Sequence, residues 1–86
     1  MQYKKEHMMG MDLTVAEHKG VVISLGEGDD WVSIYSCISI EEGRGNTQEA
    51  IAIIKNDYKG KELCGSVPLN DAMKHIYDKL GVNYIV

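Results

Sequence analysis

The stretch that decides the fold is WVSIYSCISI, residues 31–40. Four of its five even-numbered residues are β-branched and apolar, from Val32 to Ile40, whereas the odd-numbered residues are mixed. Successive side chains of a strand point to opposite faces, so this alternation predicts one long strand over 31–40. Its apolar face makes the side chains of Ile38 and Ile40 candidates for the core.

A second strand is predicted just before this one. The run Val21–Leu25 is rich in β-branched residues, and it is followed by the cluster GEGDD at 26–30. Glycine and aspartate in such a cluster favour a turn, so residues 21–40 are predicted to form a β-hairpin. Residues 1–18 fit neither the helical nor the strand period, and no element is predicted there.

Helical spacing begins after the long strand. Ala50, Ile51, Ile54 and Tyr58 recur at intervals of one, three and four residues, which predicts a helix over about 47–59. We expect Asn46 and Glu49 to form a capping box and Gly60 to end the helix, as glycine often does just past a C-terminus. A short strand over 61–67 follows.

The last part of the chain predicts a second helix and a final strand. Pro68 ends the preceding strand, and Asn70 is a candidate N-cap. Gly81 ends the helix, and the brief apolar segment 82–86 predicts a last strand. The apolar residues of the helix fall on one stripe that would face a sheet, namely Met73, Ile76, Tyr77 and Leu80.

The order of elements defines the expected fold. A β-hairpin is followed by strand, helix, strand, helix and strand, and a strand-helix-strand unit joins parallel strands by a right-handed crossover. We therefore expect an α/β protein, in the form of an α+β sandwich with a mixed sheet. At 86 residues, the chain 1–86 is predicted to be a single domain.

Composition and charge exclude several classes of function. The formal net charge is −4 and no basic cluster stands out, which argues against direct nucleic-acid binding. No apolar run approaches a membrane span, and the two cysteines and three histidines lack metal-ligand spacing. We expect a cytoplasmic protein without a metal. Lys55, Lys59 and Lys61 form a small basic patch, interpreted as compensation of a helix dipole.

The loop at 41–47 is the first candidate site. It leads from a strand into a helix N-terminus, and its glycines Gly43 and Gly45 leave backbone N–H groups uncovered. Bare amides at a helix N-terminus suit an anion such as a phosphate. The same glycines occur in plain connections where glycine supplies only a positive φ, and the loop by itself favours neither interpretation.

The segment 70–82 reads N-x-x-M-x-x-I-Y-x-K-x-G-V, and it resembles a helix of the GNAT superfamily of N-acetyltransferases. The family pattern there is N-x-x-A-x-x-L-Y-x-K-x-G-F, so Asn70, Tyr77, Lys79 and Gly81 match in register. The family's acetyl-coenzyme A motif, Q/R-x-x-G-x-G/A, falls on residues 42–47, where Gly45 supplies the first motif glycine. The resemblance covers roughly residues 31–86 and implies an N-terminally shortened GNAT-like fold, that of the acyl-CoA N-acyltransferases.

The resemblance also implies roles for particular residues. Tyr77 would be the catalytic acid that protonates the departing thiolate, and Asn70 would bond to the pantetheine region. Backbone groups at the end of the long strand would hold the pantetheine arm and the acetyl carbonyl, and amides of the loop would hold the pyrophosphate. The cofactor-binding residues would thus be Ile38, Ser39, Ile40, Gly43, Arg44, Gly45, Asn46, Thr47 and Asn70.

Simpler interpretations of these residues remain open. Tyr77 shares its stripe with core residues, so periodicity alone fits a buried tyrosine with a hydrogen-bonded tip as well as an acid. Asn70 could serve only as the helix cap. Several side chains could act as the general base, and the sequence favours none of them over the others: Glu27, Glu41, Glu42, His18 and His75.

The leading functional hypothesis is an N-acetyltransferase that moves an acetyl group from acetyl-CoA to an amine, with a protein as the expected acceptor. The alternative is a catalytically inactive binding module or inhibitor of the same fold, for example a phage-encoded one, that acts by protein–protein interaction. Thr47 and Glu42 depart from the cofactor motif and support the alternative. The small size and exposed strand edges lead us to expect a homodimer.

Overall fold

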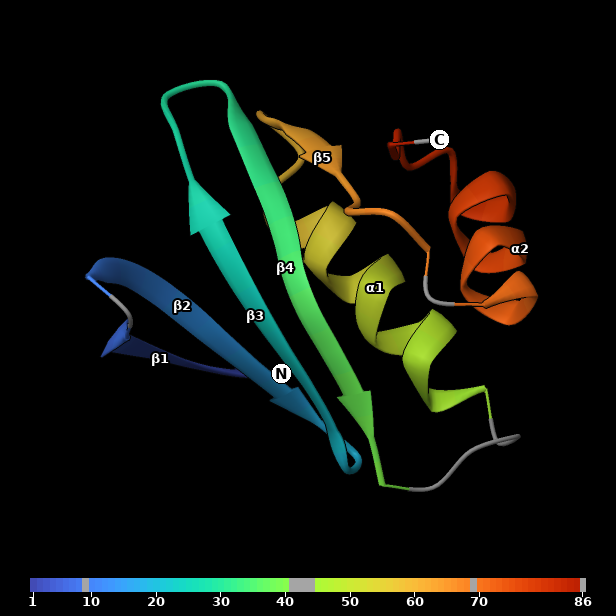
Figure 1. Cartoon of the computed structure of the whole chain (residues 1–86), viewed down its shortest axis with the longest axis horizontal. Helices are drawn as coiled ribbons and strands as arrows, with labels where there is room; N and C mark the ends of the chain where they lie inside the picture. The colour runs from blue at the N-terminus through green and yellow to red at the C-terminus, as the bar shows by residue number, and fades with distance from the viewer. Residues whose placement is uncertain (9, 41–44, 69, 86) are drawn as a thin grey trace.

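In a computed structural model of the chain, the described residues form one mixed sheet of five strands, in the order β1-β2-β3-β4-β5, and two helices that pack against it (Figure 1). The structure describes residues 1–86 except 9, 41–44, 69 and 86. The first four strands are antiparallel, and β5 is parallel to β4. This confirms the predicted α/β class and the mixed sheet. The element bounds are β1 Gln2–Met8, β2 Met11–His18, β3 Val21–Glu27, β4 Trp31–Ser39, α1 Asn46–Asp57, β5 Glu62–Cys64 and α2 Asp71–Leu80.

The N-terminal hairpin of β1 and β2 is an addition to the predicted fold. The two strands pair from Gln2 opposite Glu17 to Met8 opposite Met11. Strand β1 is the edge of the sheet, and no residue of it is buried. A strand that buries neither face needs no alternation of apolar and polar residues, so its sequence carries no period that could be read.

The hairpin of β3 and β4 matches the prediction, with one correction in β4. Leu25 pairs with Ile34 but Ser24 pairs with Ser36, so Tyr35 is an extra residue in β4, a β-bulge. The bulge reverses the phase of the strand. Val32 and Ile34 are buried as predicted, but Ile38 and Ile40 are 62% and 78% exposed. The expectation that these two side chains lie in the core is therefore wrong.

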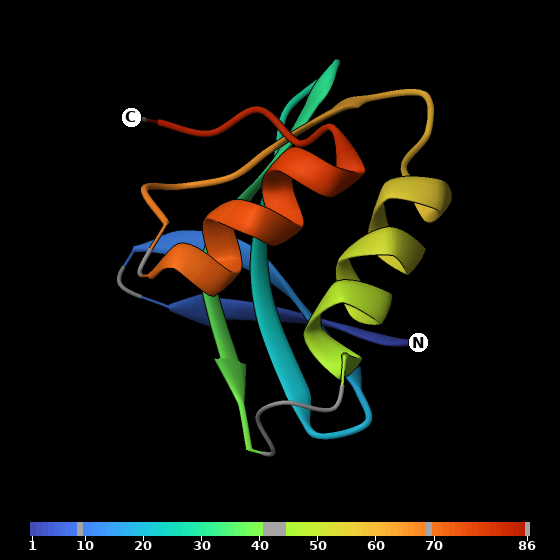
Figure 2. The same cartoon turned by 90° about the vertical axis from the view of Figure 1, so that its right-hand side faces the viewer.

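Both helices lie on the same side of the sheet, in front of the strands in Figure 2. Three residues of α1, namely Ala50, Ile51 and Ile54, are fully buried. In α2 the predicted stripe is confirmed, because Tyr77 is buried and Met73, Ile76 and Leu80 are partly buried against the same core. The remaining core comes from the strands and the chain end: Ala16, Val21, Ile23, Leu25, Val32, Ile34, Leu63 and Val82.

The ends of the helices correct two predictions and confirm one. The N-cap of α1 is Gly45, with no side-chain cap bond, and Glu49 binds Lys19 instead of closing a capping box. Helix α1 ends at Asp57, so Gly60 lies beyond its C-terminus and is not its left-handed terminator. The second helix is as predicted, because Asn70 caps it and Gly81 ends it with φ 69°.

Of the two C-terminal strands predicted, the first is shorter than expected and the second is not formed among the described residues. Strand β5 covers Glu62–Cys64 rather than 61–67. Among residues 82–85 there is no strand, only an isolated parallel bridge between Asn83 and Cys64. The chain end therefore lies beside β5 without extending the sheet as a sixth strand.

Neither described helix is both long and apolar enough to cross a membrane. Among the described residues, no three His, Cys, Asp or Glu side chains are grouped so that they could hold a metal ion.

Candidate functional site

The parallel strands β4 and β5 separate soon after they meet. Their ladder comprises three pairs, from Trp31 opposite Glu62 to Ser33 opposite Cys64. Beyond Ser33 the strand β4 continues to Ser39, whereas the chain after Cys64 turns to other partners. The edge of β4 therefore forms no further ladder with β5, and a wedge opens between them.

Two contacts draw the chain after β5 away from β4. The backbone N–H of Gly65 donates to the carbonyl of Asn83 at 2.5 Å. The ring of Tyr77 lies directly over Gly65, where a Cβ atom would come within 2.7 Å of the ring atoms Cε2 and Cζ. Gly65 is thus required at this point because it lets the tyrosine ring approach the backbone.

A cavity of about 280 Å³ occupies the wedge. One wall is β4 around its bulge, and the other is formed by residues 66–67 and α2. Aliphatic and sulfur-containing side chains supply most of the lining, with a few hydroxyl groups among them. The lining residues are Ile34, Tyr35, Ser36, Cys37, Ile38, Ser66, Val67, Met73 and Tyr77.

Tyr77 is both a core residue and a wall of this cavity. It is only 2% exposed, and its ring stacks on that of Tyr84 at a centroid distance of 5.6 Å. Burial raises the pKa of Tyr77, the nearby Cys37 raises it further, and a hydrogen bond with Ser66 opposes the shift. The phenol therefore stays protonated at neutral pH, so the two interpretations of Tyr77 are compatible.

Asn70 acts as the cap of α2. Its side-chain oxygen accepts a hydrogen bond from the backbone N–H of Met73 at 2.9 Å, and its side chain is exposed. The capping interpretation is confirmed, and the bond to a pantetheine arm stays a prediction.

The variant Asn70→Ala tests both roles of this side chain. Loss of the cap should lower the free energy of unfolding by about 1 kcal/mol, measured by urea denaturation. Asn70→Ser keeps a capping oxygen and should recover most of that stability. If Asn70 also binds the cofactor, acetyl-CoA affinity falls in both variants; if affinity is unchanged in Asn70→Ser, the side chain is only a cap.

The other predicted cofactor residues lie at the far end of β4 and the start of α1. Gly43 and Arg44 lie outside the described residues. Gly45 has φ 72°, the positive φ that glycine also supplies in a plain connection, and Asn46 and Thr47 begin the first turn of α1. Ile38 lines the cavity, whereas Ser39 and Ile40 do not and lie beyond it along the strand.

None of the described base candidates lines the wedge cavity. Glu27 accepts hydrogen bonds from Lys61 and Lys5, and the bond with Lys61 is the main cause that lowers its pKa. His18 has its Nε2 atom 3.5 Å from a carboxylate oxygen of Glu49. Glu41 and Glu42 lie outside the described residues.

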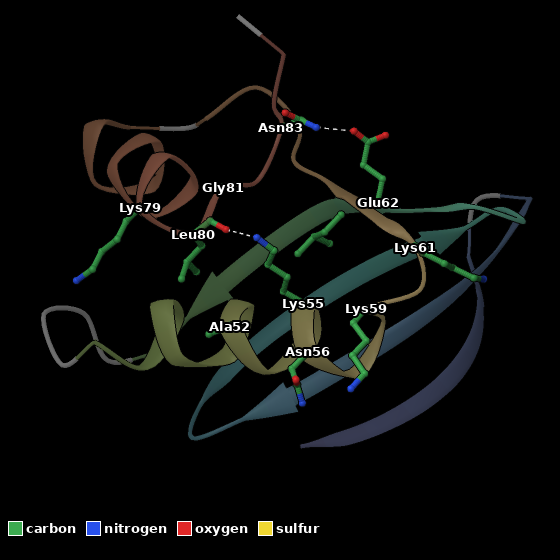
Figure 3. A pocket seen from close by; sticks show the side chains of 11 residues that line it. Ala52, Lys55, Asn56, Lys59, Lys61, Glu62, Lys79, Leu80, Gly81 and Asn83 are labelled. Carbon is green, nitrogen blue, oxygen red and sulfur yellow. Dashed lines mark hydrogen bonds between the residues drawn. The ribbon is translucent and has the colours of Figure 1, made fainter.

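A larger groove of about 620 Å³ lies between the C-terminal ends of the two helices and β5 (Figure 3). It contains the predicted basic patch. Lys55 donates to the carbonyl of Leu80 and so compensates the C-terminus of α2, while Lys61 binds Glu27 and the carbonyl of Gly28. Lys59 and Lys79 extend in different directions (Figure 3). The lysines do not converge on one point, so we place the candidate site in the wedge.

Sequence reasoning missed Cys37, Ser66 and Gly65 as parts of the site. The alternation of residues 31–40 assigned Cys37 to the face away from the apolar one, but the bulge places it on the face that the helices cover. Gly65 carried a readable signal, because a glycine inside a predicted strand often marks a close approach of another group.

Comparisons of the chain with models of known protein families, with curated proteins and with solved structures find no match. The structure itself defines the class of protein, an α+β domain whose mixed five-stranded sheet opens between its two parallel strands.

Proposed function

We propose that the chain is an N-acetyltransferase of GNAT-like fold that transfers the acetyl group of acetyl-CoA to an amine, with a protein as the expected acceptor. The observation that carries this proposal is the wedge: a parallel pair that ends after three residue pairs, with Tyr77 on the wall of the cavity beyond it. Ligands of α/β sheets commonly bind where strands separate at their C-terminal ends.

The edge of β4 suits a thioester. From Ile34 to Ile38, β4 forms no ladder with β5, and such a strand edge offers backbone N–H and C=O groups in a fixed row, which can hold the amide groups of a pantetheine arm. Attack of an amine on the thioester carbonyl gives a tetrahedral oxyanion, and preorganised N–H donors stabilise it. The bulge at Tyr35 reorients the backbone within the cavity wall, as bulges near active sites commonly do.

Tyr77 suits the second half of the reaction. The amine nitrogen forms a bond to the carbonyl carbon, and the oxyanion then collapses with cleavage of the carbon–sulfur bond. The leaving group is the thiolate of coenzyme A, which takes the proton of the Tyr77 hydroxyl, while the amine releases its own proton to a base or to water. The raised pKa of Tyr77 means that the hydroxyl is protonated at neutral pH before the transfer, and the phenolate that the transfer leaves regains a proton from water.

The start of α1 suits the diphosphate. Its first backbone N–H groups lack helical partners, and the helix dipole makes this end positive. The αL conformation of Gly45 turns the chain into the helix without a side chain over those amides. Along the chain, α1 is the next element after β4, the strand that forms one wall of the cavity.

Calorimetric titration with acetyl-CoA is the direct test. We expect binding in the micromolar range, a similar affinity for coenzyme A, and release of free thiol when a mixture of amine and peptide acceptors is added. No binding at millimolar acetyl-CoA would overturn the proposal, because the cavity would then not hold the cofactor.

One observation favours the alternative of a binding module. The apolar side chains of Ile38 and Val67 are 62% and 56% exposed at the cavity, which suits a protein partner as well as a pantetheine arm. The purified protein distinguishes the two. Adenine absorbance in the protein as isolated supports the enzyme, whereas a stoichiometric protein partner without nucleotide supports the binding module.

A further inference from the structure

The sheet has two very different faces. Both helices pack on the face that carries Ala16, Ile23 and Ile34, and no described helix covers the opposite one (Figures 1 and 2). We call this opposite side of β1 to β4 the open face. By strand register, it carries the odd-numbered residues of β2 and the even-numbered residues of β3, with Ser36 and Ile38 of β4 beyond the bulge.

The open face is rich in exposed apolar side chains. The rings of Trp31 and Tyr35 lie over Gly28 and Gly26, where any Cβ would collide with them. Leu13 is buried on this face although neither described helix covers it, and Val15 and Val22 are half-buried. Four of the exposed large apolar side chains among the described residues lie on this face, namely Met11, Trp31, Tyr35 and Ile38, with exposures of 39–62%.

The sequence of β3 favours burial of Val22 on the open face as well as of the residues that face the helices. An antiparallel strand with one solvated face normally alternates apolar and polar residues. Strand β3 instead has adjacent apolar residues at Val21, Val22 and Ile23. The charged residues that strand register places on the open face lie at its margins, and both signs occur there: Lys4 and Glu6 on the edge strand β1, and Glu17 near the end of β2.

We propose that the open face is the interface of a homodimer, in which two copies of this chain pack sheet on sheet across a two-fold axis. Strands spaced about 4.8 Å apart, with a rise of about 3.3 Å per residue, give four strands of about eight residues a footprint of roughly 500 Å². Two copies would bury about 1,000 Å², the lower limit for a specific interface. Two sheets packed face to face form a standard core about 10 Å thick.

A second copy fits this face better than a polyanion or a strongly charged protein. The centre of the face is uncharged, and a margin with both signs can complement itself when a two-fold axis brings two copies together. The interface would also adjoin the wedge, because Tyr35, Ser36 and Ile38 belong both to the open face and to the cavity lining. The dimer stands independently of the proposed acetyltransferase function, since it needs no cofactor.

Light scattering and the fluorescence of Trp31, the only tryptophan, test the proposal on the full chain. At tens of micromolar we expect twice the mass of the 9.6 kDa chain. Dilution should shift the emission of Trp31 to longer wavelength as the indole becomes hydrated. Met11→Glu and Ile38→Glu should each weaken the dimer more than tenfold, because each places a charge in an apolar interface.

Ile85→Glu is the matched control, because Ile85 is exposed to the same 62% as Ile38 and lies at the C-terminal end rather than on the open face. It should remain dimeric.

A monomer at hundreds of micromolar would overturn the proposal. A dimer that forms despite both substitutions, with no change in Trp31 emission, would also overturn it, because that dimer would associate through a strand edge. The same holds if the mass rises only when an acceptor protein is added. Since Met11 does not line the cavity, its variant should bind acetyl-CoA as before, which separates this test from that of the function.

Discussion

Tyr77→Phe should lower the maximal rate of acetyl transfer about 100-fold while leaving the affinity for acetyl-CoA within about twofold of the original. Loss of a general acid typically costs two to four orders of magnitude in rate. The ring stays in place, so the packing against Gly65 and Tyr84 is retained. The loss of one hydrogen bond with Ser66 should cost about 1 kcal/mol of stability. The measurement is thiol release at saturating acetyl-CoA, with affinity from calorimetry.

Tyr84→Phe is the matched control. The Tyr84 hydroxyl donates to Asp78 at 2.7 Å, and its ring stacks on Tyr77, so this variant removes a phenol oxygen beside the site without touching the proposed acid. Its rate should stay within about threefold of the original, since a lost exposed hydrogen bond has a small effect. If Tyr77→Phe turns over at the original rate, the tyrosine is only a core residue and the proposed chemistry fails.

The raised pKa of Tyr77 also predicts how the stability of the unmutated protein changes with pH. A phenol normally loses its proton near pH 10, and burial moves the pKa of Tyr77 upward. The folded protein therefore binds the proton more tightly than the unfolded chain does. The stability due to this group is present below about pH 10 and is lost as the pH rises through the folded pKa.

The sequence predicted those parts of the fold in which one periodic signal decides the outcome. Helix α2 has a cap, an apolar stripe and a terminal glycine that all agree, and its bounds are correct. Strand β1 was missed because it is exposed on both faces, and the end of β4 was assigned to the wrong face because a bulge changes the phase without leaving a period of its own. Register is a tertiary property, so residues 31–40 alone could not reveal it.

The candidate site, too, was predictable from the sequence only in part. The location of Tyr77 on a stripe that faces the sheet followed from its spacing, but its contact with Gly65 and its place on the wedge wall depend on where β5 ends. A shorter β5 than the predicted 61–67 is what opens the cavity. The apolar pattern of 61–67 could not give this length, because the backbone of Gly65 pairs with Asn83 from the chain end rather than with β4.

Gly65→Ala should therefore damage both stability and activity. The added methyl carbon would lie 2.7 Å from two ring atoms of Tyr77, closer than non-bonded carbons tolerate, and the ring is also stacked on that of Tyr84. Overpacking of a buried site typically costs 1–3 kcal/mol, so we expect a loss of about 2 kcal/mol, measured by urea denaturation. The displaced ring should also reduce the rate about tenfold or more, because a catalytic group moved by about 1 Å loses its alignment.

Gly60→Ala separates this crowding from the general effect of replacing glycine. A Cβ at Gly60 meets nothing within 4 Å, and neither Gly60 nor Gly65 has a positive φ, so backbone conformation disfavours alanine at neither position. Gly60→Ala should be neutral or stabilising by a few tenths of a kcal/mol.

A double-mutant cycle tests directly whether the tyrosine ring is the cause of the crowding. In a Tyr77→Leu background the ring is gone, and Gly65→Ala should then cost less than about 0.5 kcal/mol. If Gly65→Ala lowers the free energy of unfolding by as much in that background, Gly65 is needed for a reason other than the tyrosine ring. The explanation that contact between Gly65 and Tyr77 holds the chain after β5 away from β4 would then be wrong.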